Sequence, residues 1–221
     1  MKNYLNIAYS KHEKPKSNYP DLLMSHILHD LLNINTGTIV DVGCGRGDQL
    51  EAIDKLGFNV IGLDREEKIC ADHLEYRQCD VIKDTFPLDD NVADVVFCKS
   101  VIEHIYLFQM DHFFSEMKRI CRRGGYIVIS TPDWKYNVKH FYGEYTHCTP
   151  FTRRSINHCL QIYELEQVST YSLIPLPVTW NSRIMRFISD VTNLLSLPRK
   201  WGKWFRWSQD RQIIAYGKVK G

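Results

Sequence analysis

A glycine-rich segment, residues 43–47 (GCGRG), is the part of the chain best suited to hold a small ligand. It follows residues 39–42 (IVDV), which are typical of a buried strand, and precedes a helical pattern that begins near Asp48. Because glycine has no Cβ, backbone N–H groups in such a turn can approach a ligand closely. A strand, a glycine turn and a helix N-terminus together predict a nucleotide-type cofactor site. A tight turn without a ligand is the simpler alternative.

The position of the third glycine decides which cofactor fits. A dinucleotide site needs a glycine at position 48, where this chain has Asp48; its third glycine comes one residue earlier, at Gly47. An acid at the helix start disfavours a pyrophosphate and suits a ligand that carries an ammonium and a sulfonium. Residues 41–47 (DVGCGRG) resemble the first motif of class I S-adenosylmethionine-dependent methyltransferases. The resemblance implies a Rossmann-like fold, S-adenosylmethionine as cofactor and methyl transfer (EC 2.1.1 type) as the reaction.

Acids at the ends of later strands extend the resemblance. Asp64 ends a second strand 21 residues after Gly43, where a carboxylate can accept both ribose hydroxyls. In the family, the acid after the third strand contacts the adenine amino group and the next backbone amide contacts a ring nitrogen, which implies these roles for Asp80 and Val81. The end of the fourth strand touches the methionine part of the cofactor. The predicted cofactor-binding residues are Asp41, Gly43, Cys44, Gly45, Asp64, Arg65, Asp80, Val81, Lys99 and Ser100.

Three further residues are suited to act on the methyl acceptor. Methyl transfer is an in-line displacement, so an enzyme mainly aligns the reacting atoms, and a hydroxyl acceptor also needs its proton removed. Glu103 and His104 follow the fourth strand, at the edge where open α/β sheets bind ligands. His147 lies in a polar, aromatic segment that resembles acceptor-holding segments of some family branches. We predict all three as catalytic residues, with His147 the leading candidate. Alternatively, Glu103 caps a helix and His104 packs on the cofactor.

The same three residues raise the alternative of a divalent metal. Small-RNA terminal 2′-O-methyltransferases and some ubiquinone-pathway O-methyltransferases hold one with an E-x-x-E-H motif and a later histidine. Glu103, His104 and His147 match this set, but Ser100 stands where the first acid is expected. Because the loss of one carboxylate weakens the binding of a hard cation, catalysis without a metal is the favoured interpretation. A metal-assisted RNA 2′-O-methyltransferase is the alternative.

Apolar runs recur at a spacing typical of alternating strands and helices. Buried Val- and Ile-rich strands between helical patterns predict a doubly wound, mostly parallel sheet covered on both faces. The resemblance adds a seventh, antiparallel strand at the end. We expect strands near residues 39–43, 59–63, 74–79, 94–98, 125–130, 164–173 and 212–219. We expect helices near residues 47–56, 107–122 and 152–161, the last one capped by Thr152.

Length and composition fit a single globular unit. A chain of 221 residues with 44% hydrophobic and 24% charged residues suits one domain with a full core. We expect no signal peptide, because residues 1–16 lack an apolar run, and no membrane span. Seven cysteines without a C-x-x-C pair fit a reduced, cytoplasmic protein. We therefore expect one domain over residues 1–221, with an N-terminal helical or lid segment over residues 1–35.

The C-terminal end of the chain is unusually basic and aromatic. Residues 175–221 hold nine Lys and Arg against two Asp and Glu, a net charge of +7, although the whole chain carries only +2. Within residues 174–210, a helical apolar run from 184 to 197 precedes residues 200–207 (KWGKWFRW). Such a segment suits an anionic membrane surface, a nucleic acid or sugars, whereas a packed lid or dimer contact is the simpler alternative. Among specific partners, peripheral membrane contact through residues 180–207, or a lipid-linked or glycan substrate, is favoured over nucleic acid.

These patterns predict an S-adenosylmethionine-dependent methyltransferase that acts on oxygen of a small molecule or of a carbohydrate or lipid-linked precursor. A catalytically silent subunit that keeps the cofactor fold is the alternative from a different class. The glycine turn, Asp64 and Asp80 argue against it, because a silent copy has no physical need for all three.

Overall fold

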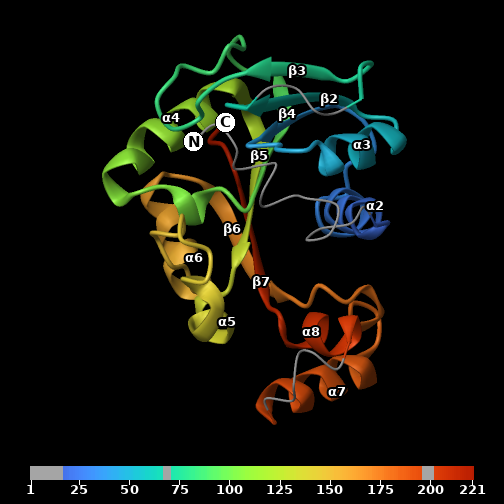
Figure 1. The fold of residues 1–221 in the computed structure, drawn as a ribbon. Helices are drawn as coiled ribbons and strands as arrows, with labels where there is room; N and C mark the ends of the chain where they lie inside the picture. Colours follow the sequence, from blue (N-terminus) through green and yellow to red (C-terminus); the bar gives the residue numbers. More distant parts are fainter. Residues whose placement is uncertain (1–16, 67–70, 196–201) are drawn as a thin grey trace.

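One seven-stranded sheet organises the chain, with the strand order β3-β2-β1-β4-β5-β7-β6 (Figure 1). The computed structural model describes residues 17–66, 71–195 and 202–221. The strands are β1 (Thr38–Val42), β2 (Asn59–Asp64), β3 (Glu75–Gln78), β4 (Ala93–Lys99), β5 (Cys121–Pro132), β6 (Glu166–Leu173) and β7 (Gln212–Lys218). Neighbouring strands are parallel except where β7 pairs with β5 and β6. The predicted doubly wound sheet with an antiparallel last strand is therefore confirmed.

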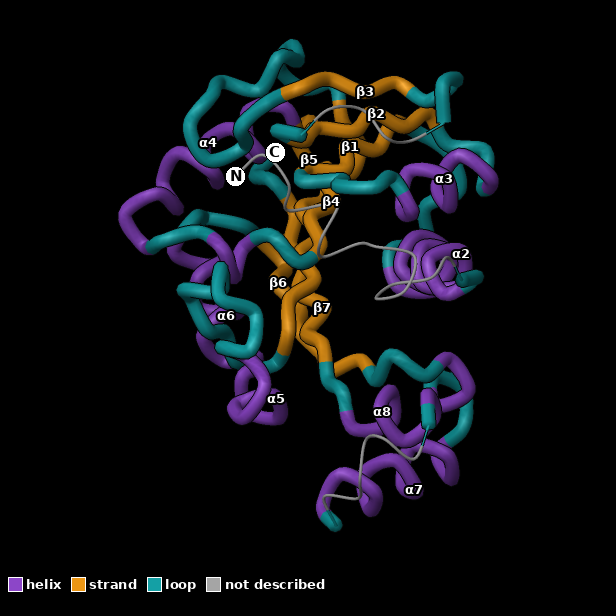
Figure 2. Tube along the Cα trace, viewed as in Figure 1, coloured by secondary structure: helices purple, strands orange, loops and turns teal. Residues whose placement is uncertain are grey.

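Helices cover both faces of this sheet. Figures 1 and 2 show α2 and α3 on one face and α4 and α6 on the other. The helices are α2 (Tyr19–Ser25), continued by the π-helix η1 (His26–Leu31), α3 (Asp48–Lys55), α4 (Met110–Ile120), α5 (Trp134–Phe141), α6 (Arg153–Ile162), α7 (Arg183–Leu194) and α8 (Lys203–Gln209). The short 3₁₀ helices are η2 (Ile102–His104), η3 (Leu107–Gln109) and η4 (Pro177–Thr179).

The alternation of strand side chains explains the two layers of the core. In β1, Ile39 packs in the cluster that includes α2 and α3, whereas Val40 packs in the cluster that includes α4 and α6. In β5, Val128 and Ile129 divide in the same way. Because successive side chains point to opposite faces, a strand covered by helices on both sides reads as a continuous apolar run. That is the pattern from which the sheet was predicted.

The strand order reverses at β1, and this reversal positions the site. From β1 the chain adds β2 and β3 on one side, and then returns to place β4 on the other side. The loops that follow β1 and β4 therefore leave the sheet in opposite directions at its carboxyl edge. Ligands of open α/β sheets bind in the crevice that such a reversal creates.

Between β6 and β7, the described residues 174–195 and 202–210 form a helical insert. It contains η4, α7 and α8, and Figure 1 shows α7 and α8 at the end of the molecule opposite β3. The Trp180 indole donates to the carbonyl oxygen of Ile174 at 2.8 Å, and its ring stacks on His26. Tyr19 makes edge contacts with both Trp180 and Trp207, so two tryptophans of the insert pack against the N-terminal helix. None of the helices in the described parts of the chain has the length and hydropathy that crossing a bilayer requires.

Candidate active site

The glycine turn after β1 has the geometry that only glycine tolerates well. Gly43, Gly45 and Gly47 all have positive φ, at 77°, 53° and 81°. A Cβ on Gly43 would also overlap the Cγ2 atom of Val101, which follows β4. The turn is tied to the neighbouring strand, because the Gly43 and Cys44 amides both donate to the carbonyl oxygen of Leu63. Gly47 is the N-cap of α3, so the turn delivers the chain directly into that helix.

Asp64, at the end of β2, faces this turn. Its Oδ2 atom accepts a hydrogen bond from the Gly45 amide at 2.7 Å, and its Oδ1 atom accepts one from the Glu66 amide at 3.0 Å. Asp80 is arranged similarly after β3, where Oδ1 accepts from the Ile82 amide at 3.1 Å. Backbone donors thus fix both carboxylates: Asp64 accepts from the β1–α3 turn and from its own loop, and Asp80 accepts from its own loop.

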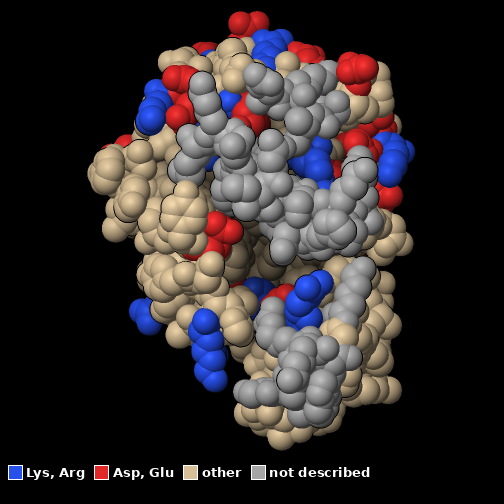
Figure 3. Space-filling model, in the orientation of Figure 1, with Lys and Arg blue, Asp and Glu red and all other residues tan. Residues whose placement is uncertain are grey.

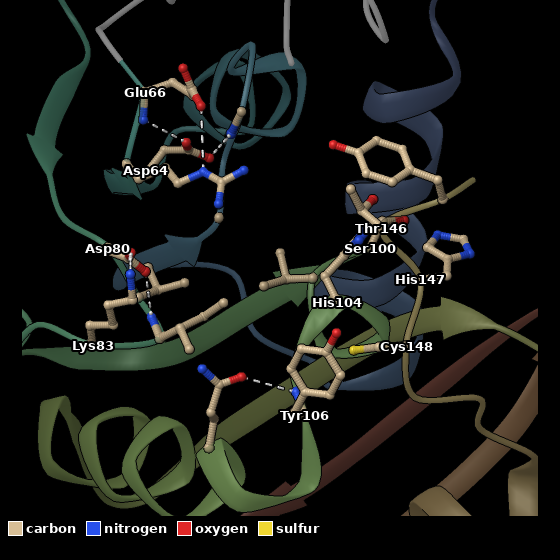
Figure 4. Close-up of a pocket in the computed structure, with 18 residues that line it drawn as sticks. Asp64, Glu66, Asp80, Lys83, Ser100, His104, Tyr106, Thr146, His147 and Cys148 are labelled. Carbon is tan, nitrogen blue, oxygen red and sulfur yellow. Dashed lines mark hydrogen bonds and ion pairs between the residues drawn. The ribbon is translucent and has the colours of Figure 1, made fainter. Parts of the chain in front are cut away.

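A cavity of about 540 Å³ lies over the carboxyl ends of β1, β2, β3 and β4. Figure 4 shows Asp64 and Asp80 on one side of it, with Thr146 and His147 on the opposite side. The loops that follow four strands and the segment after α5 therefore converge on one space. The predicted residues that line the cavity are Gly43, Gly45, Asp64, Arg65, Asp80, Val81, Ser100, His104 and His147.

Two imidazoles meet at the far side of the cavity. The rings of His104 and His147 lie 4.7 Å apart between centroids, with an interplanar angle of 62°. His147 Nδ1 donates to the carbonyl oxygen of Phe141 at 2.7 Å, which places the proton on Nδ1 and leaves Nε2 as the acceptor in the neutral ring. Burial, followed by the neighbouring His147, lowers the pKa of His104 to about 4. His104 is therefore neutral at pH 7.

Glu103 lies behind the cavity wall. Its side chain is fully buried, and Oε2 accepts a hydrogen bond from the Thr131 hydroxyl at 3.0 Å. Its carbonyl oxygen accepts from the amides of Cys148 and Thr149, at 2.9 and 3.0 Å. Glu103 thereby links the turn after β4, the end of β5 and the segment that carries His147. It holds the two histidine-bearing segments together without lining the cavity itself.

Three predicted cofactor-binding residues, Asp41, Cys44 and Lys99, also lie outside the lining. Asp41 is buried in β1, and its Oδ2 atom has no hydrogen-bond partner. Burial raises the pKa of Asp41 to about 7; the charge of Lys99 acts in the opposite direction and that of Asp64 adds to the increase. A buried carboxyl with an unpartnered oxygen is costly unless something compensates it. The next residue, Val42, leads directly into the glycine turn.

Asp48, on which the choice of cofactor partly rests, is neutralised locally. Its carboxylate pairs with the Arg46 guanidinium, with Nε at 3.1 Å from Oδ1, and it does not line the cavity. Asp48 therefore occupies the position where a dinucleotide motif has its third glycine, but it does not itself present a charge to the ligand space.

Half of the lining comes from residues that sequence reasoning did not single out. They are Glu66, Ile82, Lys83, Val101, Tyr106, Gln109, Tyr145, Thr146 and Cys148. Most of them directly follow a predicted residue or flank His147, so proximity in the sequence was an available signal. Tyr106 and Gln109 lie further along, beside and within η3, where only the fold brings them to the site. Ser100 is in the left-handed region, at φ 57°, a conformation that a non-glycine residue rarely adopts outside functional turns.

The geometry also defines a candidate cation cluster. Ligand atoms of Glu103, His104 and His147 all lie within 4.8 Å of one another. Two imidazoles and one carboxylate suit a borderline transition metal more than Mg²⁺, which prefers oxygen ligands.

Comparisons with known proteins agree with this geometry. Residues 40–129 match the family described as "Methyltransferase domain". A probable S-adenosylmethionine-dependent methyltransferase of Mycolicibacterium smegmatis is 33% identical over 123 residues, 54% of this chain and 46% of that protein. A ubiquinone biosynthesis O-methyltransferase of Rickettsia prowazekii is 30% identical over 136 residues, 58% and 48% of the two chains. The crystal structure of an S-adenosylmethionine-dependent methyltransferase from Archaeoglobus fulgidus superposes with a TM-score of 0.68 at 19% identity, covering 96% and 99%.

Residues 40–129 therefore match a methyltransferase domain, and the chain has the fold of class I S-adenosylmethionine-dependent methyltransferases. S-adenosylmethionine is the cofactor of that enzyme class, so the predicted family and cofactor class are confirmed. The chain spans about half the length of the curated relatives it matches.

Proposed function

We propose that this protein transfers the methyl group of S-adenosylmethionine to an oxygen of a small-molecule acceptor. The observation that carries the proposal is the two-sided cavity. Backbone-fixed carboxylates and a glycine turn form one side, and a pair of imidazoles forms the other. S-adenosylmethionine, when bound, supplies a methyl group on a positively charged sulfur. The similarity to proteins named as ubiquinone biosynthesis O-methyltransferases supports an oxygen acceptor.

The cofactor side fits the chemistry of this group. Asp64 would accept the ribose hydroxyls, and Asp80 and Val81 would contact the adenine edge. Gly43 and Gly45 would allow the backbone to approach the cofactor closely, because neither carries a Cβ. Asp41 offers an unpartnered buried oxygen near the turn, which a cationic amino group would compensate electrostatically. Each of these roles follows from a donor or acceptor present at the position the resemblance implies.

On the acceptor side, His147 is the proposed general base. The Phe141 carbonyl fixes its Nδ1 proton, so Nε2 takes the proton from the acceptor hydroxyl while the oxygen forms its new bond to the methyl carbon. The carbon–sulfur bond breaks in the same step and its electrons remain on sulfur, which becomes neutral. His104, with its pKa near 4, is a weak base and serves to orient the acceptor. Glu103 acts as a positioning residue for His147 through its carbonyl and carboxylate contacts.

The rim of the cavity supports an acceptor with a flat or apolar part. Tyr106 and Tyr145 line the cavity and expose 55% and 77% of their surfaces. Exposed aromatic rings stack on planar rings and on the apolar faces of sugars. A phenolic small molecule or a glycan or lipid-linked precursor would satisfy this requirement. An RNA acceptor is less favoured, because the three acids of the lining outnumber its two bases, Arg65 and Lys83, which pair with Glu66 and Asp80, so the cavity offers no excess positive charge to phosphates.

Label transfer tests the proposal directly. The full chain is incubated with S-adenosylmethionine carrying a tritiated methyl group and with separate small-molecule, lipid and RNA fractions. We expect acid-stable tritium in the small-molecule or lipid fraction. Label in RNA alone, lost with EDTA and restored by Mn²⁺, would instead favour the metal-assisted alternative built on Glu103, His104 and His147. Binding of the cofactor without transfer to any fraction would favour the silent subunit.

A further inference from the structure

Helix α7 exposes its apolar side chains to solvent. Ile184 is 73% exposed, Phe187 68% and Leu194 83%, and Leu195 directly after the helix is 62% exposed. Steps of three, seven and one residue keep these positions within one stripe of a helix with 3.6 residues per turn. Ile188, at 39% exposure, falls in the same stripe. We call these five residues the α7 apolar face.

The opposite side of α7 is buried and polar. Ser189 is fully buried and its hydroxyl donates to the carbonyl oxygen of Ser208 in α8, while Thr192 is 7% exposed and donates to the carbonyl oxygen of Ser189 at 2.8 Å. Asn193 Nδ2 donates to the carbonyl oxygen of Gln209 at 2.8 Å. A helix packed only for stability in water buries its apolar stripe, because that burial is the main driving force of packing. Here the polar side of α7 packs inward, so the α7 apolar face is exposed and suited to contact with an environment other than water.

The basic residues around α7 restrict which environment its apolar face can contact. Residues 175–210, which contain α7 and α8, hold six basic and two acidic residues, a net charge of +4. Arg183, at the start of α7, and Arg206, in α8, are both exposed. In Figure 3, the part of the lower lobe that is not grey, around α7 and α8, is tan, and blue basic atoms with some red lie above it. A second copy of this chain seated on α7 would bring two such basic segments together, which like-charge repulsion opposes. An anionic lipid surface offers both an apolar layer and compensating charge.

We propose that α7 is a membrane-contact helix, which lies in the headgroup boundary of an anionic lipid surface with its apolar face toward the acyl chains. The proposal does not depend on methyl transfer. It assigns the contact to the outward side chains of α7, whereas Trp180 and Trp207 pack inward against Tyr19.

Vesicle sedimentation with the full chain tests the proposal. Vesicles of phosphatidylcholine alone are compared with vesicles that contain phosphatidylglycerol, at low and at high salt. We expect binding to the anionic vesicles, weakened by salt because exposed charges are screened over about 8–10 Å. The double variant Ile184→Ser with Phe187→Ser should bind at least tenfold more weakly. The matched control is Ile162→Ser in α6, since Ile162 is also 73% exposed but lies outside the α7 face.

A charge variant and a measurement of affinity for the demethylated cofactor product, which checks that each variant is folded, complete the design. Arg183→Glu with Arg206→Glu should weaken binding to anionic vesicles without changing the α7 apolar face. Affinity for the demethylated cofactor product, measured without vesicles, should match that of the unmodified chain in every variant. The proposal is overturned if the unmodified chain ignores anionic vesicles, or if the Ile184→Ser/Phe187→Ser variant binds them normally. A concentration-dependent dimer that this variant abolishes would overturn it in favour of a second copy. Because no acceptor is present, these outcomes are separate from success or failure of methyl transfer.

Discussion

At the scale of single residues, Asp64 combines two tasks. One carboxylate oxygen holds the Gly45 amide at 2.7 Å, and the carboxylate as a whole is the proposed partner of the cofactor ribose. Loss of the side chain would therefore leave a turn donor unsatisfied in addition to removing the ligand contact. A substitution that keeps an acceptor oxygen separates the two effects.

We expect Asp64→Ala to weaken binding of the demethylated product S-adenosylhomocysteine by about 1–3 kcal/mol. Asp64→Asn keeps an oxygen for the Gly45 amide but loses the charge and one acceptor, so it should weaken binding by less. Isothermal calorimetry measures both. Unchanged affinity in Asp64→Ala would remove this residue from the cofactor site.

His147→Ala should leave product affinity unchanged and lower turnover by roughly 10²-fold or more, because the proposed base is lost while the cofactor side is intact. The control is His140→Ala, since His140 is exposed on α5 and does not line the cavity. Rates are measured with an acceptor identified by label transfer. Near-normal turnover in His147→Ala would end its assignment as base.

Residue types and spacing were sufficient to predict which segments form the site, but not which way each side chain points. Glu103 and His104 are adjacent in the sequence and were predicted as a pair. The structure places His104 in the cavity lining and Glu103 behind it, fully buried. Within a 3₁₀ turn, neighbouring side chains diverge, and only the packing of Thr131 and of the segment around Cys148 determines which one faces inward.

At the scale of elements, two turns depend on glycine to different degrees: the turn between β1 and α3, at Gly43, and the turn after α3, at Gly57. Gly43 combines a positive φ of 77° with a neighbouring Val101 side chain that leaves no room for a Cβ. Gly57, after α3, has a φ of 85°, but no heavy atom lies within 4 Å of the place that a Cβ would take. Comparing alanine substitutions at Gly43 and Gly57 therefore distinguishes the cost of backbone strain from the cost of steric overlap.

We expect Gly57→Ala to lower the free energy of unfolding by about 1–2 kcal/mol, the cost of a left-handed conformation for a residue with a Cβ. Gly43→Ala should cost about 1–3 kcal/mol more, because Val101 must also move. Urea unfolding of both variants measures the difference. Equal losses would mean that the β1–α3 turn accommodates the added methyl group without strain.

The inner strands were predictable because β1, β2, β4, β5 and β7 each contain a buried apolar run, whereas the edge strands β3 and β6 are mostly exposed or half-buried. β1, β2 and β4 differ from their predicted bounds by at most one residue at each end. Helix α5 was not predicted, since residues 134–141 bury only Phe141 and so lack a regular apolar stripe. The predicted helix over 107–122 begins instead with η3 and ends at Ile120, where β5 starts. Cap and stripe patterns define helix bodies better than helix ends.

At the scale of the whole molecule, the helices α7 and α8 lie outside the sheet, but the residues that point outward there differ from those the sequence emphasises. The aromatic rings of 200–207 stand out in the sequence because basic and aromatic residues alternate there. Trp207 packs against Tyr19 and Trp204 against Phe205, and Trp201 lies outside the described residues. Contacts between segments almost 190 residues apart in sequence decide this, and no local pattern encodes them.

Asp41, which is buried, and His104, which is half-buried, give the folded molecule opposite responses to pH. Asp41 has its pKa raised to about 7, so the unfolded chain releases this proton first and stability falls as pH rises between about 4 and 7. His104 has its pKa lowered to about 4, so the unfolded chain binds this proton first and stability falls as pH drops from 6.5 toward 4. In the shared window each slope approaches about 1.4 kcal/mol per pH unit for one proton, with opposite signs. The two contributions therefore largely cancel in the unmodified chain.

Single substitutions should expose each slope. The free energy of unfolding of Asp41→Asn, relative to that of the unmodified chain, should increase as pH rises from 4.5 to 6.5. The reason is that the substitution removes only the contribution of Asp41, which falls with rising pH. His104→Gln should change in the opposite direction over the same range, because the ascending contribution is removed. Subtracting the free energy of unfolding of the unmodified chain cancels the contributions of the other titrating groups, which both variants retain. These groups include Asp133 and Glu116. Urea unfolding at three pH values gives the two differences. Parallel rather than opposite trends would show that at least one of these groups is exposed to solvent or paired with charge in the folded protein, and the buried electrostatics assigned to this site would then be wrong.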